Sequence, residues 1–225
     1  MKKPDQRQIL EYLSGFMTKR RLQRMHQVLN QRTRHLTVVM EDIFQTHNAS
    51  AVLRSCECLG VQDVHIIENR NVFEVNPDVV LGAAKWLSIH RYNEGEDNTV
   101  ACLQALKEKG YRLVATTPHR NDCLPEELPL ERKTALLFGT ELEGLSREAM
   151  EMADGFVKIP MWGFTESFNI SVSAAITLYH LGRRLRESGI DWQLSAPEKE
   201  ALLKEWIMKS LKNADRILER FQGFS

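Results

Sequence analysis

The sequence predicts an α/β fold built on a mainly parallel sheet. Short apolar runs rich in β-branched residues alternate with stretches of helical periodicity, and glycine follows several of the helical stretches. Six apolar runs are expected to be strands, at residues 36–40, 64–67, 87–92, 112–116, 135–139 and 156–159. Strands that alternate with helices along a chain are typical of a parallel sheet with helices on both faces.

The helices expected between these strands have recognisable ends. One helix from about 49 to 59 stops at Gly60, and another from 98 to 109 stops at Gly110, since glycine commonly follows the last helical residue. Residues 36–67 therefore have the order and length of a strand, helix and strand unit. Further helices are expected at 77–84, 146–153 and 167–187.

Helical extensions are expected on both sides of this domain. Residues from about 5 to 34 show helical spacing of apolar residues, with a possible break at Gly15. Near the other end, Ser195 to Glu198 form a capping-box pattern, and one helix is expected from there to about Phe221. The predicted organisation is an N-terminal basic extension at 1–35, an α/β domain at 36–189 and a C-terminal helical extension at 190–225.

Composition excludes several classes of protein. The formal net charge is zero, which argues against nucleic-acid binding through overall charge but leaves a local basic patch open. No apolar run approaches the roughly 18 residues of a membrane span, and the first residues lack the apolar core of a signal peptide. We therefore expect a cytoplasmic protein. Cys56, Cys58, Cys102 and Cys123 lack the spacing of a zinc site or a disulfide framework, so we expect free, core-type thiols and no metal.

The N-terminal extension holds a local excess of positive charge. Between Thr18 and His35 there is no acidic residue, and the basic residues are Lys19, Arg20, Arg21, Arg24, Arg32 and Arg34. Arg21 and Arg24 are three residues apart and so share a helix face. The segment is either a solvated helix face or an arm that contacts phosphate, for which the planar guanidinium is well suited.

Polar loops follow two of the expected strands, where α/β proteins place ligand sites. One loop, 138–146, carries Glu141, and the other turns after Pro160 and reaches a helix start at Ser167 and Asn169. Ser167 and Asn169 can cap that helix or face a ligand. Neither loop is a GxGxxG fingerprint and no Walker motif occurs, which disfavours the common dinucleotide and nucleotide sites.

Arg54 interrupts an otherwise apolar helix, and a partly buried arginine needs an anionic partner. A structural salt bridge, for instance to Glu141, and a substrate phosphate explain this arginine equally well. His47 lies seven residues earlier on nearly the same face, and Asn48 is expected at the N-cap of the helix.

Three segments together resemble the three motifs of the SpoU/TrmH family of SPOUT RNA methyltransferases, in the same order along the chain. They are 47–56, 137–146, and 159–161 with 167–175. The resemblance spans about residues 19 to 189. Within the family, the arginine-rich lead is most similar to the members that methylate the 2'-hydroxyl of guanosine-18 in tRNA.

The resemblance implies a deep trefoil knot in the C-terminal part of the domain, a homodimer and a tRNA substrate. S-adenosylmethionine would be bound by Thr116, Gly139, Ile159, Met161 and Phe168. The catalytic site would contain Arg54 as the essential arginine, with Asn48, Glu141, Ser167 and Asn169. RNA would contact Arg21, Arg24, Arg32 and His47.

The chemistry implied by the family needs a proton acceptor, because a ribose hydroxyl is a poor nucleophile until it loses its proton. Guanidinium normally stays protonated, so Arg54, His47 and Glu141 all remain candidates for that base. The alternatives are a methyltransferase acting on 23S ribosomal RNA or another tRNA position, a noncatalytic RNA-binding protein of the same fold, and a metabolic enzyme acting on a phosphorylated small molecule.

Overall fold

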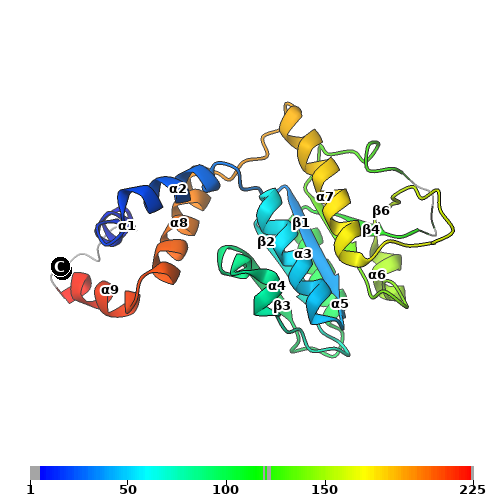
Figure 1. The fold of residues 1–225 in the computed structure, drawn as a ribbon, viewed down its shortest axis with the longest axis horizontal. Helices are drawn as coiled ribbons and strands as arrows, with labels where there is room; N and C mark the ends of the chain where they lie inside the picture. Colours follow the sequence, from blue (N-terminus) through cyan, green and yellow to red (C-terminus); the bar gives the residue numbers. More distant parts are fainter. Residues whose placement is uncertain (1–5, 119, 121–122, 224–225) are drawn as a thin grey trace. The chain divides into compact units, whose positions relative to one another are not determined.

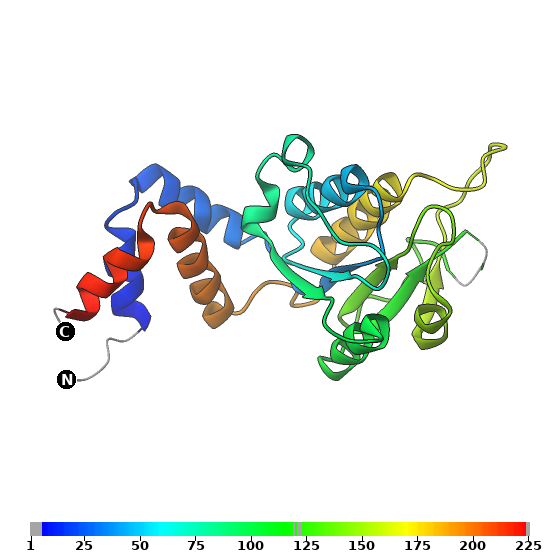
Figure 2. The ribbon, with the colours of Figure 1, turned by 90° about the horizontal axis from the view of Figure 1, so that it is seen from below.

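The computed structural model describes residues 6–118, 120 and 123–223. The chain divides into two compact units, one made of Thr33–Trp192 and the other of Met1–Arg32 with Gln193–Ser225. The larger unit contains every strand of the described residues, and the smaller unit is helical (Figures 1 and 2).

The larger unit is an α/β domain with a six-stranded sheet in the order β3-β2-β1-β5-β4-β6. Every neighbouring pair of strands is parallel, which confirms the predicted sheet. The strands are β1 (Leu36–Glu41), β2 (Asp63–Ile67), β3 (Ser88–Tyr92), β4 (Arg112–Thr116), β5 (Thr134–Phe138) and β6 (Gly155–Val157). Each lies within two residues of its expected bounds.

The sheet separates two apolar cores, because successive side chains of a strand point to opposite faces. In β1, Val38 and Met40 belong to one core and Val39 to the other. Helices α3 (Thr46–Leu59) and α7 (Ile170–Glu187) cover the first face, while α5 (Asn98–Glu108) and α6 (Arg147–Met152) cover the second (Figure 1). Helix α4 (Pro77–Val80) and the short 3-10 helix η1 (Ala83–Trp86) pack beside α3.

The smaller unit consists of α1 (Gln6–Ser14), α2 (Lys19–Leu29), α8 (Ala196–Ser210) and α9 (Ala214–Gly223). The break expected near Gly15 is present, and residue 5 lies outside the described residues. The capping box at Ser195 is confirmed. The single helix predicted to reach Phe221 is wrong, because Asn213 adopts a left-handed φ of 58° between α8 and α9.

The predictions from composition have mixed outcomes. Cys56 and Cys102 are buried free thiols, but Cys58 is exposed, so the core position expected for it is wrong. No helix in the described part of the chain is both long and apolar enough to cross a membrane.

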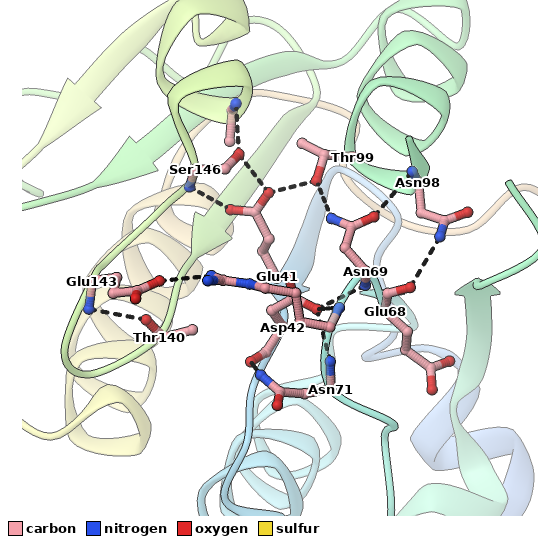
Figure 3. Close-up of polar contacts among 12 residues, drawn as sticks. Glu41, Asp42, Glu68, Asn69, Asn71, Asn98, Thr99, Thr140, Glu143 and Ser146 are labelled. Carbon is pink, nitrogen blue, oxygen red and sulfur yellow. Dashed lines mark hydrogen bonds and ion pairs between the residues drawn. The ribbon is translucent and has the colours of Figure 1, made fainter. Parts of the chain in front are cut away.

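A buried carboxylate at the end of β1 organises the edge of the sheet. Glu41 is 3% exposed and accepts hydrogen bonds from Ser146 N (2.8 Å), Ser146 Oγ (2.7 Å) and Thr99 Oγ1 (2.6 Å) (Figure 3). Ser146 is the N-cap of α6, and Thr99 lies in the first turn of α5. The carboxylate therefore ties the starts of two helices to an inner strand.

The next residue, Asp42, fixes the loop that follows β2. Its Oδ1 accepts hydrogen bonds from three successive backbone N–H groups, those of Asn69 (2.7 Å), Arg70 (2.9 Å) and Asn71 (3.3 Å) (Figure 3). Asp42 is 4% exposed and has a φ of 51°, a conformation that short polar side chains tolerate better than most. The loop after β2 is thus anchored to the end of β1.

A buried histidine makes the stability of the domain sensitive to acid. His65 in β2 is 2% exposed and stacks on His90, with 4.7 Å between ring centroids. Burial first, and the charge of His90 second, lower the pKa of His65 to about 3 from 6.5. The unfolded chain therefore takes up this proton near pH 6.5, while the folded domain keeps a neutral imidazole down to about pH 3.

We expect the free energy of unfolding to fall as the pH decreases from about 6.5 towards 4. The variant His65→Phe, which keeps an aromatic ring against His90, should reduce this slope by up to about 1.4 kcal/mol per pH unit, the contribution of one proton. Urea unfolding at several pH values measures the slope. His26→Gln, at an exposed position of α2, is the control, and equal slopes in wild type and His65→Phe would contradict the prediction.

Candidate active site

A cavity of about 740 Å³ lies at the carboxyl ends of β4, β5 and β6. In a parallel sheet this edge is where the loops leave room for a ligand. The residues expected to bind S-adenosylmethionine come from three separate segments, and all of them line this cavity: Thr116, Gly139, Ile159, Met161 and Phe168. The structure therefore brings together a set that the sequence places far apart.

A tight turn after β5 forms one wall of the cavity. Thr140 and Gly144 exchange two backbone hydrogen bonds, of 2.8 and 3.0 Å, and Gly144 has a φ of 72°. A Cβ atom at Gly139 would lie 2.1 Å from the backbone of Gly144, so only glycine allows this close approach. The turn projects Leu142, which is 99% exposed.

Three of the predicted site residues form a closed cluster of hydrogen bonds. Asn48 Nδ2 and Asn169 Nδ2 each donate to Oε1 of Glu141 at 2.7 Å, and Asn169 Nδ2 also lies 3.1 Å from Oδ1 of Asn48. Asn48 is 5% exposed and comes from α3, Glu141 from the turn after β5, and Asn169 from the start of α7. This polar cluster joins the three motifs at the rim of the cavity, since Glu141 and Asn169 also line it.

Asn169 combines two roles that the sequence left open. Its Oδ1 accepts hydrogen bonds from Ser171 N (2.9 Å) and Ser171 Oγ (2.6 Å), which makes it the N-cap of α7, while its amide nitrogen belongs to the polar cluster. The predicted helix start at Ser167 is therefore three residues early. Ser167 is exposed and lines the cavity.

Helix α3 starts earlier than predicted, and this changes the position of Asn48. Gln45 is the N-cap and makes no side-chain capping bond, so Asn48 lies within the first turn. The prediction of Asn48 as N-cap is wrong, because its amide donates to Glu141 and to Gln45 Oε1 (2.8 Å) instead.

Arg54 and His47 are both exposed on α3. Among the described residues no ion pair joins Arg54 to Glu141, so the structural salt bridge considered for this arginine is not formed. Arg54 does not line the large cavity. The partly buried position predicted for Arg54 is wrong, because the side chain is exposed on α3 and accessible to an anion outside the chain.

The arginines of the smaller unit differ in accessibility. Arg21 and Arg24 are exposed on α2, and Arg21 donates to Ser210 Oγ at 3.3 Å. Arg32 is fully buried, and its guanidinium carbon lies 5.4 Å from the centre of the Trp206 ring. Arg32 presents no surface to RNA in this structure, whereas the positions of Arg21 and Arg24 permit such a contact.

A second, smaller pocket of about 270 Å³ lies against the same turn. Both cavities are lined by Thr140, Glu141, Leu142 and Glu143. Asn48, a predicted site residue, also lines the small pocket, but sequence reasoning missed other residues of its lining, among them Phe44 and Arg70. Arg70 lies in the loop after β2, and no local pattern indicates that this loop meets the turn after β5.

Several known proteins are similar to this chain in sequence. A sequence profile of the SpoU rRNA Methylase family matches residues 35–179. Two proteins named tRNA (guanosine(18)-2'-O)-methyltransferase are similar along most of their length. The protein from Borreliella burgdorferi is 46% identical over 201 residues, covering 89% of this chain and 90% of its own. The protein from Aquifex aeolicus is 33% identical over 202 residues, covering 88% of this chain and 92% of its own length.

Solved structures agree with the sequence comparison. The A. aeolicus TrmH/SpoU tRNA modifying enzyme superposes with a TM-score of 0.77 at 31% identity, covering 87% of this chain and 98% of its own. The SpoU methyltransferase AviRb from Streptomyces viridochromogenes, solved with AdoMet, has a TM-score of 0.59 at 25% identity, covering 73% and 62%. The shared sheet, the profile match and the identity to these relatives show that the chain belongs to the SpoU rRNA methylase family.

Proposed function

We propose that this protein uses S-adenosylmethionine to methylate the ribose 2'-hydroxyl of a tRNA nucleotide, guanosine-18 in the D-loop. The observation that carries the proposal is the hydrogen-bonded cluster of Asn48, Glu141 and Asn169 at the rim of the large cavity. The names of the B. burgdorferi and A. aeolicus relatives support the choice of reaction and substrate.

The lining of the large cavity fits S-adenosylmethionine, which supplies a methyl group on a positively charged sulfur. Apolar side chains such as Phe138 and Ile159 suit an adenine ring, and the carboxylates of Glu141, Glu143 and Glu166 favour a cation. Thr116, Gly139, Met161 and Phe168 complete the proposed cofactor site.

The catalytic residues would act by positioning. Asn48 and Asn169 hold the Glu141 carboxylate at the point where the three loops meet, and Ser167 lines the same cavity. Arg54, exposed on α3, would bind the phosphate next to the target ribose. Ordered reactants lower the barrier when the hydroxyl oxygen and the methyl carbon are held in line. The proton acceptor is one of Arg54, His47 and Glu141.

The alternative in the same reaction class is another RNA ribose. A solved structure of a protein concerned with 2-OH methylation of C/U34 on tRNA has a TM-score of 0.59 at 26% identity and covers 68% of this chain. The B. burgdorferi guanosine-18 relative matches more of this chain, 89% against 68%, at higher identity, which favours the D-loop guanosine. Mapping of the methylated nucleotide distinguishes the two targets.

We further propose a homodimer and a trefoil knot in the C-terminal part of the α/β domain, in a cytoplasmic protein. Large apolar side chains are exposed along the turn after β5 and from the loop before α7 into that helix: Leu142 (99%), Trp162 (92%) and Tyr179 (56%). Exposed apolar surface of this kind marks protein contacts, and a second copy would cover it.

The first test of the proposed function measures methyl transfer from labelled S-adenosylmethionine to unmodified tRNA transcripts, with nuclease mapping of the product. Wild-type protein should label the D-loop guanosine. Arg54→Ala should lower the rate about 100-fold or more while cofactor affinity stays unchanged, because Arg54 does not line the cofactor cavity. Arg147→Ala, on the exposed side of α6, is the control. Ribosomal RNA is assayed in parallel, and its labelling without labelling of tRNA would overturn the proposed substrate. Full activity of Arg54→Ala would overturn the role of the arginine.

The polar cluster makes a separate prediction about Glu141. Glu141→Ala removes the acceptor of two amide donors, so we expect kcat/KM to fall about 100-fold and cofactor affinity to weaken. Glu141→Gln keeps an oxygen acceptor and should bind the cofactor within several-fold of wild type. Isothermal titration and steady-state kinetics measure the two quantities. Equal cofactor affinity in wild type and Glu141→Ala would show that the cluster does not shape the cavity.

The exposed arginines of α2 are expected to contact tRNA phosphate. Affinity for tRNA should weaken with salt, and Arg21→Ala and Arg24→Ala should each reduce the slope of log K against log salt by about 1. Fluorescence anisotropy at several salt concentrations measures this slope. Arg183→Ala, an arginine paired with Glu187 on α7, is the control, and an unchanged slope in both α2 variants would remove this helix from the RNA-binding surface.

A further inference from the structure

The small pocket has a composition that the proposed reaction does not explain. Its apolar lining includes Ile43, Phe44 and Ile170, and Phe44 is 76% exposed at its edge. Its charged lining is mixed, with Arg70 beside the carboxylates of Glu141 and Glu143. The pocket shares one wall with the proposed cofactor cavity, so a group bound in it would lie next to the reacting centre.

Arg70 is held in place by contacts that reach across the fold. Its Nη2 donates to Glu143 Oε2 at 2.7 Å, and its Nε lies 3.6 Å from Asp42 Oδ2. Its backbone N–H is one of the three that donate to Asp42 Oδ1. Glu41 also accepts two hydrogen bonds from Ser146, three residues after Glu143, and so fixes the end of the segment that carries Glu143. The side chain of Arg70 nevertheless remains 63% exposed.

The charges around Arg70 decide what the pocket can accept. A phosphate would meet the two carboxylates as well as the guanidinium, and repulsion from Glu141 and Glu143 opposes it. A nucleobase instead offers flat apolar faces together with edge groups of both kinds. Guanine presents acceptors at O6 and N7, which suit arginine, and donors at N1 and N2, which suit a carboxylate. Adenine would place an acceptor at N1 and a donor at N6 against the same pair.

We propose that this pocket holds the base of the target nucleotide, turned out of its stack, and that Arg70 and Glu143 select guanine over adenine. Phe44 packs against a face of the base, as aromatic side chains do with unstacked bases in RNA recognition. This inference rests on the proposed function and adds to it the residues that determine which base is accepted.

The test compares single-turnover methylation of two tRNA transcripts that carry guanosine or adenosine at the target position. Excess enzyme makes slow methylation of the adenosine transcript measurable. Arg70→Lys keeps the positive charge but loses the fork that binds two acceptors, so its rate on guanosine should fall roughly 5- to 150-fold with little change on adenosine. Glu143→Gln can donate to adenine N1 and should increase the rate on adenosine relative to guanosine. An increase of this kind does not result from misfolding.

The controls separate base selection from other roles. Arg147→Lys removes the fork of an exposed arginine that is paired with Glu151 outside the pocket, and it should leave both rates unchanged. If Arg70→Lys lowers the methylation rate equally on both transcripts, Arg70 has a phosphate or structural role and the inference is overturned. A ratio of guanosine to adenosine rates equal to that of wild type in both pocket variants would also overturn it. Absence of methylation of either transcript by the wild-type protein would reject the proposed function itself.

Discussion

The buried carboxylate of Glu41 is the interaction on which the rest of the ligand-binding edge depends. An ionised carboxylate is costly to bury unless hydrogen bonds replace its hydration, and Glu41 receives three of them, from Ser146 and Thr99. β1 is an inner strand, because it pairs with β2 on one side and β5 on the other. These bonds therefore fix the starts of α5 and α6 relative to the middle of the sheet. Asp42 extends the same anchoring to the loop after β2.

Rigid anchoring matters here because the two proposed ligands meet at a single turn. Thr140 to Glu143 line both the large cavity and the small pocket, so a shift of this turn would move both ligands relative to each other. The turn is held by Gly139 and Gly144 at its base, by Asn48 and Asn169 at Glu141, and by Arg70 at Glu143. In-line transfer loses rate steeply when reacting groups are misplaced, and these contacts restrict that misplacement.

Much of the fold could be predicted because its signals are local. The inner strands are short apolar runs such as Val38 to Met40, and Gly60 ends α3 with a φ of 80° as its sequence position indicates. Two of the errors arose where a side chain has a distant partner. Asn48 looks like an N-cap from its neighbours, but its amide bonds Glu141, 93 residues away. Arg32 looks like its exposed neighbours, but Trp206 covers it.

The candidate site shows the same division between local and distant signals. The polar motifs could be found from residue types, and the structure places Asn48, Glu141 and Asn169 in contact. The small pocket could not be found, because Arg70 and Glu143 are 73 residues apart and each looks like an ordinary surface charge. The structure shows that the fold fixes Arg70, through its contact with Glu143 and through the three backbone N–H groups that donate to Asp42.

The distribution of charge fits a protein in which one set of residues binds the RNA backbone and another set selects the target base. Phosphate contacts position a protein on RNA without reading its sequence, whereas contacts to base edges select the sequence. The basic residues of α2 lie in a segment without acids, which suits phosphate binding. The small pocket carries two carboxylates with one arginine, which suits a base edge and disfavours phosphate. A chain with zero net charge can therefore act on RNA, since its acidic residues include those that would select the base.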